Sequence, residues 1–222
     1  MYKTETHLHV SEVSPCAKLS AEEMIKLYAE AGYTTVFVTD HCKKHYFENY
    51  GDIPWNEKVS RFFLGYRNAK AAGEKYGITV LCGAEFAFKT AADHYLAYGI
   101  TEEFMCEHPD IFDIGVENVY PLAKENGIFM VQAHPFRDGK SNPTPEYVDA
   151  IEVYNSNPRH NDNSDKSEQL AKELNKPVTA GSDAHRTEDV GLSGVMSEKP
   201  VRTPEDYIEL VLSGKAVLIG RD

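Results

Sequence analysis

The chain has 222 residues, of which 41% are hydrophobic, and its 23 basic and 35 acidic residues give a net charge of −12. This length is sufficient for one α/β domain with a buried core, and we expect a single domain over residues 1–222. The acidic balance disfavours stable binding of long nucleic acid. A small phosphorylated substrate is compatible with it, because bound divalent cations invert the field of a pocket locally.

The cysteines and the hydrophobic segments favour a soluble intracellular protein. The four cysteines are far apart and form no Cys-x-x-Cys pair, so neither a disulfide framework nor a zinc ribbon is predicted. The N-terminal sequence lacks the basic start and apolar run of a signal peptide, and no later segment has the length of a membrane span. We therefore expect a cytoplasmic protein without a membrane partner, and the sequence indicates no oligomeric state.

Strands and helices are predicted to alternate from the N-terminal third onward. Ser20 and Glu23 have the spacing of a capping box, and Gly32 follows the last apolar position, which predicts a helix between Ser20 and Gly32. The β-branched and apolar run 34–39 predicts a strand buried on both faces. One helix is then predicted over 56–76, where apolar residues recur at three- and four-residue steps.

The same alternation continues in the rest of the chain. Further strands are predicted at 78–82, 95–98, 128–132, 150–154, 177–180 and 216–219, and further helices at 116–125, at 164–174 and after Pro204. Such βα units imply a parallel sheet, and their number favours a closed or nearly closed barrel over an open Rossmann sheet. No Gly-x-Gly-x-x-Gly or Walker sequence predicts a loop that holds a nucleotide. The polar segment 155–165 is predicted as a loop at the functional edge.

Side chains that can bind metals follow the predicted strands. His7 and His9 lie on the same side of an extended segment, because strand side chains alternate with a period of two. The other candidates are His41, Glu85, His94, His134, Asp183 and His185. Each of them directly follows an apolar run except His94, which begins one. Because the carboxyl ends of parallel strands meet on one face of a barrel, we expect these side chains to lie together.

Imidazole nitrogens and carboxylate oxygens suit zinc, iron or manganese, and a carboxylate can bridge two ions. Eight candidate ligands exceed what a single ion binds, so the set predicts two or three metals around a common water or hydroxide. A lone histidine at a strand end is more often structural than a ligand, and it is the set that favours a metal site. His45, His108 and His160 fall in predicted loops and are interpreted as solvated polar residues.

The ordered set resembles the polymerase and histidinol phosphatase (PHP) family. The motifs that carry the resemblance are His7-x-His9, Thr39-Asp40-His41, Gly83-x-Glu85, the later His94, Ala133-His134-Pro135 and Ser182-Asp183-x-His185. The resemblance implies a distorted (β/α)7 barrel, related to the TIM barrels of metal-dependent hydrolases. It also implies up to three metals, commonly zinc, iron or manganese.

Carried over by position, the resemblance implies three neighbouring metal sites. One metal would be held by His7, His9, Glu85 and Asp183. A second would share Glu85 and be held also by His94 and His134, and a third would be held by His41 and His185.

The third site is where the sequence departs from the family pattern. Members with three metals often have a histidine or aspartate a few residues after the His-x-His pair. Here Glu12 and Cys16 are the candidates for that place, and the alternative is that neither binds. Full occupancy of the third site is therefore left open.

The predicted metals imply hydrolysis of a phosphate ester. A water shared by two cations loses a proton near neutral pH and can attack phosphorus in line. Asp183 and His185 are the candidate catalytic residues for moving protons, with ligation alone as the simpler account, and Asp40 is a candidate to orient a ligand. Arg137 and Arg159 are the candidate substrate-binding residues, because a guanidinium matches a phosphate edge; ordinary solvated charges are the alternative.

Two other functions are compatible with these residues. Related His-x-His barrels of the amidohydrolase type cleave amides or lactones, although they commonly have a lysine that bridges the metals and none follows a strand here. A non-catalytic metal-binding PHP module is the second alternative.

Among phosphoesters, the sequence does not choose between histidinol phosphate, nucleotides, nucleoside bisphosphates, short oligonucleotides and phosphotyrosine. The aromatic residues after His41 are interpreted as lid or core packing, with stacking on a substrate ring as the alternative; they are Tyr46, Phe47, Tyr50 and Trp55.

Overall fold

The computed structural model describes residues 1–88 and 93–220. Ten strands of this part of the chain form one sheet, in the order β10-β9-β1-β2-β4-β5-β6-β7-β8, and β3 pairs with β4. They are β1 (Tyr2–Leu8), β2 (Thr35–Val38), β3 (His41–Lys43), β4 (Thr79–Ala87), β5 (His94–Tyr98), β6 (Phe129–Ala133), β7 (Ala150–Asn155), β8 (Val178–Gly181), β9 (Gly194–Ser197) and β10 (Val217–Ile219).

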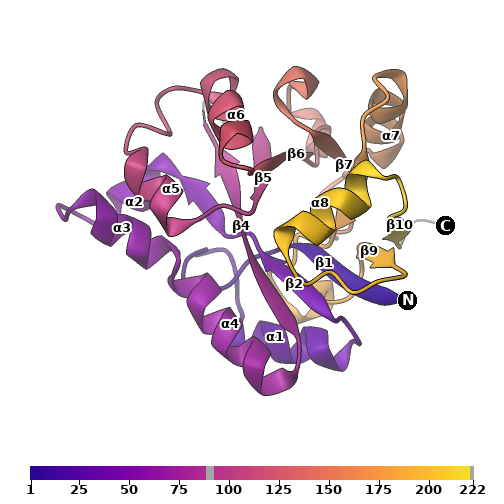
Figure 1. The fold of residues 1–222 in the computed structure, drawn as a ribbon, viewed down its shortest axis with the longest axis horizontal. Coiled ribbons are helices and arrows are strands. Elements are labelled where there is room, and N and C mark those ends of the chain that lie inside the picture. Colours follow the sequence, from indigo (N-terminus) through magenta and orange to yellow (C-terminus); the bar gives the residue numbers. More distant parts are fainter. Residues whose placement is uncertain (89–92, 221–222) are drawn as a thin grey trace.

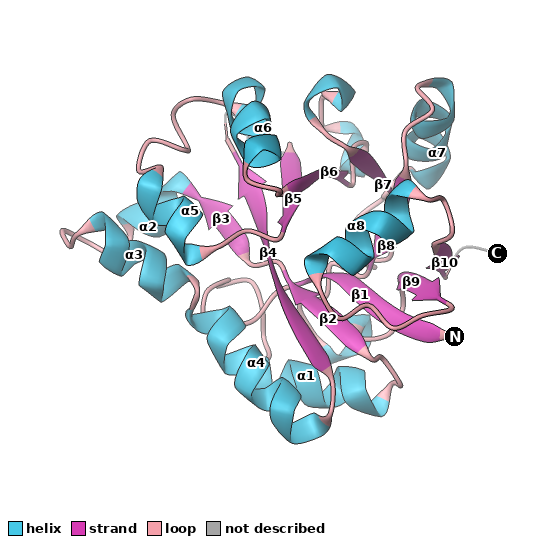
Figure 2. Ribbon diagram, viewed as in Figure 1, coloured by secondary structure: helices cyan, strands magenta, loops and turns pink. Residues whose placement is uncertain are grey.

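Eight α-helices of the described residues surround the strands (Figures 1 and 2). They are α1 (Ala21–Glu30), α2 (Lys44–Glu48), α3 (Trp55–Phe62), α4 (Leu64–Tyr76), α5 (Glu102–Glu107), α6 (Val116–Glu125), α7 (Ser164–Glu173) and α8 (Pro204–Leu212). Among the described residues, no helix is both long enough and apolar enough to cross a membrane. All four cysteines are free thiols.

The sheet curves into a nearly closed barrel. A parallel bridge between Leu8, at the end of β1, and Ala184, just after β8, joins the two sides of the sheet. The buried carboxylate of Glu5 strengthens this junction, because it accepts a hydrogen bond of 2.9 Å from the backbone N–H of Ser182. This arrangement confirms the predicted α/β barrel and brings the carboxyl ends of β1 and β8 together.

The sheet departs from the predicted parallel arrangement at β5 and at the unpredicted strand β9. β5 runs antiparallel to both β4 and β6, and β9 runs antiparallel to β1 and β10. The reversal at β5 explains why His94 begins its strand, since His94 pairs with Ala133 at the end of β6. The start of β5 and the end of β6 therefore lie at the same edge of the sheet.

Local sequence signals place the boundaries of most elements. The Ser20 side chain accepts from the backbone of Glu23 and the Glu23 side chain accepts from the backbone of Ser20, which confirms the capping box at α1. The single helix predicted over 56–76 is wrong, because α3 and α4 are separate helices that meet at Phe63. Two buried, adjacent phenylalanine rings, Phe62 and Phe63, pack edge to face at this break. β3, α2, α5 and β9 were not predicted, since such short elements show no clear period.

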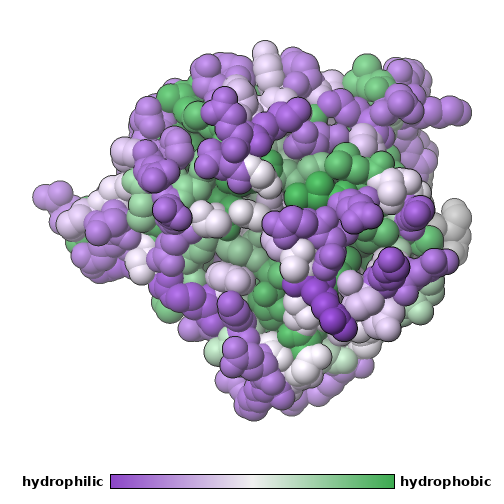
Figure 3. Space-filling view, viewed as in Figure 1, coloured by the Kyte–Doolittle hydropathy of each residue, from purple (hydrophilic) through white to green (hydrophobic). Residues whose placement is uncertain are grey.

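One cluster of the hydrophobic core lies at the end of the barrel opposite His94. Tyr207 of α8 is fully buried, and its ring packs against Phe37 and Tyr98 with centroid distances of 5.0 and 4.7 Å. Tyr98 ends β5 and pairs with Phe129 at the start of β6. Figure 1 shows α8 lying across the strands, and Figure 3 shows hydrophobic side chains gathered around α8 and β4 inside a hydrophilic margin. This packing leaves the other end of the barrel for polar residues.

Replacing Gly194 by alanine should weaken the pairing of β1 with β9. Gly194 has φ +128°, and a Cβ there would lie 2.4 Å from the carbonyl oxygen of Thr4. We expect Gly194→Ala to lower the free energy of unfolding by about 2–4 kcal/mol, measured by urea denaturation.

The matched control is Gly214→Ala, because Gly214 also has a positive φ, of +67°, but no atom lies within 4 Å of the added Cβ. Its expected loss is about 1 kcal/mol. Equal losses in the two variants would contradict the importance of the close approach to Thr4.

Candidate metal centre

The structure brings the eight predicted metal ligands together at one end of the barrel. None of them is more than 8% exposed. Among the described residues, their donor atoms form four groups of three whose atoms all lie within 4.8 Å of one another. The groups are His7, His9 and Glu85; His7, His134 and Asp183; His41, Glu85 and His94; and His9, His41 and His185. Each predicted ligand belongs to at least one group.

Glu85 lies at the centre of the cluster and is fully buried. Its Oε1 is 2.7 Å from Nδ1 of His94 and 3.0 Å from Nε2 of His134. Its Oε2 contacts Nδ1 of His41 and is 3.8 Å from Nε2 of His9. A carboxylate with imidazoles around both oxygens is suited to bridge two ions.

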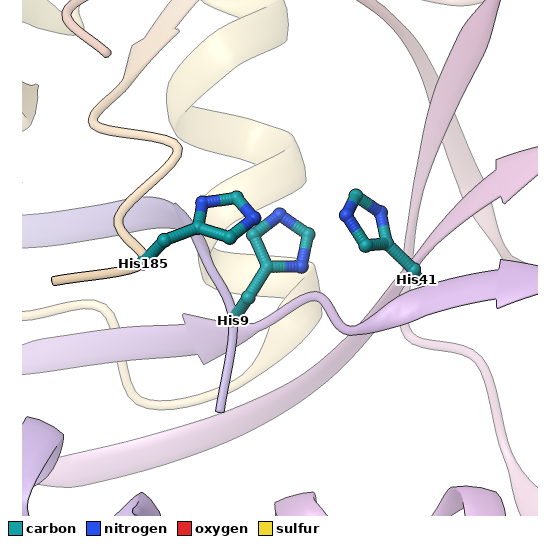
Figure 4. Close-up of side chains that lie close together, drawn as sticks. All are labelled: His9, His41 and His185. Carbon is teal, nitrogen blue, oxygen red and sulfur yellow. The ribbon is translucent and has the colours of Figure 1, made fainter. Parts of the chain in front are cut away.

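His9 lies between His41 and His185 (Figure 4). The ring centroids are 4.2 Å from His41 and 4.3 Å from His185. The three rings come from the end of β1, the start of β3 and the segment after β8. The group around the expected third site therefore contains an additional imidazole, that of His9.

Two of the eight ligand candidates have backbone conformations unusual for non-glycine residues. Asp183 has φ 48° and His134 has φ 30°. Such conformations cost about 1–3 kcal/mol and persist where the surroundings hold them. The carbonyl of Asp183 accepts from Nδ2 of Asn157 at 3.1 Å, and the N–H of His134 donates to Oε2 of Glu152 at 2.9 Å. These contacts fix both side chains toward the cluster.

Glu152 is a buried positioning residue that sequence reasoning missed. Its Oε1 lies 2.9 Å from Nδ1 of His7, while Oε2 holds the backbone of His134. The contact with Nδ1 leaves Nε2 of His7 facing Glu85 at 3.4 Å. An acidic residue inside the apolar strand β7 is the sequence signal that could have identified it.

Asp40 acts on the cluster through a neighbour. Its Oδ1 accepts from the N–H of Val10 at 2.9 Å and from the hydroxyl of Ser14 at 2.7 Å, and that hydroxyl lies 3.5 Å from Nδ1 of His9. Burial raises the pKa of Asp40 to about 7. Asp40 therefore supports the segment after β1 and contacts no ligand ring in this network directly.

The two candidates for an extra ligand at the third site lie outside the four donor groups. Both carboxylate oxygens of Glu12 accept from the N–H of Ala21 at the start of α1, at 3.1 and 3.0 Å. Cys16 lines the pocket above the histidines, but its sulfur belongs to no donor group among the described residues. As placed, neither side chain completes the third site.

Burial keeps several imidazoles in the neutral form that binds metals. It lowers the pKa of His41 and of His134 to about 4, and it lowers the pKa of His9 well below the usual value. Burial also opposes the charged form of His7, but neighbouring carboxylates, Glu152 foremost, raise its pKa well above the usual value. Metal binding at His7 would therefore release a proton.

The donor atoms fit divalent metals. Nε2 of His7 and Nδ1 of His134 are buried without a hydrogen-bond partner in the described part of the chain. Leaving a buried polar atom unpaired costs about 1–3 kcal/mol, a cost that coordination would remove. Six imidazoles and two carboxylates are ligands suited to zinc, iron or manganese. The residues present therefore fit the metals that the family resemblance implies.

A pocket of about 250 Å³ opens onto the cluster, and its lining is rich in positive charge. Four of the eight ligand candidates reach it, namely His41, His94, Asp183 and His185. Four basic residues also line it, namely Lys43, Arg137, Arg159 and Arg186. On a chain with a net charge of −12, this local concentration of cations favours an anionic ligand.

Both arginines predicted to bind phosphate line the pocket, and each already has a carboxylate partner. Nη1 of Arg137 donates to Oδ2 of Asp183 at 3.1 Å. The guanidinium of Arg159 binds both oxygens of the buried Asp189, at 2.7 and 2.6 Å. Asp189 also accepts from the N–H of His185 at 2.8 Å. Arg159 therefore supports the loop that carries His185, whereas Arg137 joins a ligand candidate to the pocket.

Comparisons with known proteins identify the fold and a partial family match. Residues 161–216 match a family model described as PHP-associated. A search of curated proteins found no match. Among solved structures, the chain is similar to a two-domain protein from Bacteroides vulgatus that contains a predicted PHP-like metal-dependent phosphoesterase, with 17% identity and a TM-score of 0.68. That similarity covers 98% of this chain and 64% of the other.

Two further solved structures are similar at comparable identity. PsfC from Pseudomonas syringae is 18% identical with a TM-score of 0.65, over 93% of this chain and 87% of that one. An amidohydrolase from Chromobacterium violaceum, with bound sulfate and no metal, is 16% identical with a TM-score of 0.59, over 99% of both chains. At these identities the likeness establishes the barrel fold.

Glu152→Gln should weaken metal binding while leaving the ligands in place. The substitution keeps the size of the side chain but removes the charge beside His7, and loss of such a supporting contact typically costs 10–100-fold in affinity. We expect a zinc dissociation constant higher by about 10–100-fold, measured by competition with a chromophoric chelator.

Glu125→Gln on the exposed surface of α6 is the matched control and should bind zinc as the unaltered protein does. An unchanged affinity in Glu152→Gln, with the fold intact by circular dichroism, would show that Glu152 does not position the cluster.

Proposed function

We propose, on the PHP family assignment that the match at residues 161–216 and the barrel fold support, that this chain is a metal-dependent phosphoesterase. Its substrate is a small phosphate monoester or diester. The observation that carries the proposal is that a pocket lined by four cations opens onto a buried cluster of side chains that can bind metals. The similar Bacteroides protein, which contains a domain described as a predicted phosphoesterase, supports the same reaction class.

The cluster holds the cofactor in this proposal. Two or three ions of zinc, iron or manganese, when bound, stabilise negative charge on phosphoryl oxygens and lower the pKa of a water molecule. The residues that would hold them are His7, His9, His41, Glu85, His94, His134, Asp183 and His185. Glu152 and Ser14 orient two of these imidazoles, and Asp183 and His185, which face the pocket, are the residues proposed to move protons.

The basic residues bind the phosphoryl group in this proposal. The Arg137 side chain is 17% exposed and uses Nη1 toward Asp183, which leaves further N–H donors for a phosphate edge. Arg159 is held by Asp189 and adds positive charge at the same pocket. The ammonium group of Lys43 has no hydrogen-bond or ion-pair partner among the described residues and is a third cation for the substrate.

An amide or lactone hydrolase is the second candidate, because one similar structure is named an amidohydrolase. The cationic lining favours the phosphoester, since a neutral amide or lactone does not require four basic residues around it. The same Chromobacterium structure contains sulfate, an anion with the tetrahedral shape of phosphate. A non-catalytic module is disfavoured by the presence of all eight ligand candidates.

Glu85→Ala should abolish both metal retention and phosphate release. We expect the unaltered protein to bind two to three equivalents of transition metal and to hydrolyse at least one small phosphoester. Removing the central carboxylate should lower kcat/KM by about 10³-fold or more and reduce the bound metal, measured by elemental analysis and phosphate detection.

The substrate panel for this test contains phosphate monoesters and diesters, amides and lactones, and Glu125→Ala is the control variant. Cleavage of amides or lactones alone would favour the second candidate. A fully metal-loaded protein that cleaves no member of the panel would overturn the proposed function.

Arg137→Gln should weaken phosphate binding more than metal binding. A bidentate charged contact to phosphate contributes about 1.5–3 kcal/mol, so we expect KM to rise about 10–100-fold. The inhibition constant of inorganic phosphate should rise in parallel. Arg61→Gln, at an exposed position of α3 outside the pocket, is the control. Unchanged phosphate inhibition together with lost metal would assign Arg137 a structural role at Asp183.

A further inference from the structure

We propose that His160, held by Asp138, donates a proton to the leaving group of the substrate. This inference rests on the proposed phosphoesterase function and deepens it. It adds a catalytic residue that lies outside the metal cluster and that the sequence analysis interpreted as a solvated loop residue.

His160 is placed where a leaving group would lie. It lines the same pocket as Asp183 and His185, and its side chain is 37% exposed, whereas those two are almost completely buried. Among the described residues, it belongs to none of the four donor groups. A phosphoryl group bound at the cluster and the arginines would therefore direct its ester oxygen toward the more open part of the pocket, where His160 lies.

The contact with Asp138 selects the nitrogen that faces the reaction. Oδ2 of Asp138 lies 2.9 Å from Nδ1 of His160. A carboxylate beside Nδ1 keeps the proton on that nitrogen and leaves Nε2 to exchange a proton with another group. Within residues 1–88 and 93–220, Nε2 has no hydrogen-bond partner. The pair therefore has the arrangement of a histidine oriented by an acid for proton transfer.

The backbone around Asp138 is organised to make this contact. Asp138 has φ 54°, its N–H donates to the carbonyl of Asn161 at 2.8 Å, and its Oδ1 accepts from the N–H of Asn161 at 3.0 Å. Hydrogen bonding to Asn161 lowers the pKa of Asp138, so the carboxylate is charged at neutral pH. A left-handed conformation costs a non-glycine residue about 1–2 kcal/mol, and such strain often accompanies a functional side chain.

Two loops cooperate in this arrangement. The 3-10 helix Arg137–Gly139 contributes a basic residue followed by Asp138, and the loop after β7 contributes Arg159 followed by His160. Each loop therefore supplies one candidate for phosphate binding and one member of the proton-transferring pair. Asp138 contacts His160, and Lys140 lies near the carboxylate of Asp138. The other charged residues that line the pocket are Lys43, Arg137, Arg159, Asp183 and Arg186.

The proposed step conserves atoms and charge. The oxygen of a water molecule forms a bond to phosphorus, and one proton of that water passes by way of Asp183 or His185 to solvent. The bond between phosphorus and the ester oxygen breaks, and its electron pair goes to the leaving oxygen. That oxygen takes the proton from Nε2 of His160, which then recovers a proton from solvent, so a monoester gives an alcohol and inorganic phosphate.

The test varies the leaving group in His160→Gln and Asp138→Asn. An alkyl phosphate needs protonation of its poor leaving group, whereas p-nitrophenyl phosphate does not. We expect kcat on the alkyl phosphate to fall by about 10²–10³-fold in His160→Gln and by less in Asp138→Asn, with kcat on p-nitrophenyl phosphate within about threefold. His45→Gln, at an exposed histidine of α2 outside the pocket, is the matched control. An equal loss on both substrates, or no loss, would overturn the role of His160.

A second measurement does not depend on turnover. In the zinc-loaded protein, the imidazole NMR signals of His160, assigned by their absence in His160→Gln, should shift on addition of inorganic phosphate while those of His45 do not. No shift of the His160 signals would contradict its place beside the substrate. If the unaltered protein hydrolyses no phosphoester, the proposed function is overturned. The NMR measurement would then show separately whether phosphate binds beside His160.

Discussion

The site depends on one constraint, which is that the carboxylate of Glu85 is buried among imidazoles and away from water. Taking a charge out of water costs several kcal/mol unless partners compensate for it, and Glu85 is fully buried. The compensation comes from histidines at the starts of β3 and β5 and directly after β1 and β6, so these four positions must lie at the same level of the barrel. Supporting residues such as Glu152 then restrict the rings to orientations that face this carboxylate. The pocket opens above this layer, where a substrate reaches the cluster without disturbing the packing around Tyr207 at the other end.

Much of this arrangement could be predicted from the sequence, because parallel strands impose a common edge. The apolar runs before Glu85 and His134 identified the strands, and the parallel barrel then placed their following residues together. His94 did not fit that rule, since the direction of a five-residue strand cannot be read from its hydrophobicity. Its antiparallel pairing removes the discrepancy and places it with the others. The break between α3 and α4 at Phe63 could not be predicted either, because the apolar period continues across it.

The residues that sequence reasoning missed act through contacts between distant segments. Glu152 and His7 are 145 positions apart, and Arg159 and Asp189 are 30 positions apart. No local period or motif indicates such pairs, although a single acidic residue inside an apolar strand is a useful signal of a positioning residue. His160 was interpreted as a solvated residue because it lies in a polar loop, and only the fold reveals Asp138 beside it. The sequence was therefore a better guide to which residues at strand ends lie together than to which charged groups form pairs.

The junction of β1 with the segment after β8 has a consequence for how the protein matures. His9 and Asp183 are 174 positions apart, and their contact exists only when the two ends of the barrel wall have met. During synthesis, the whole segment from His9 to Asp183 must be made before this contact can form, and the long loop that it closes makes it a late event in folding. A nascent chain that stops short of Asp183 lacks the donor groups that contain Asp183 or His185. Binding of the full set of cations would then follow closure of the barrel wall.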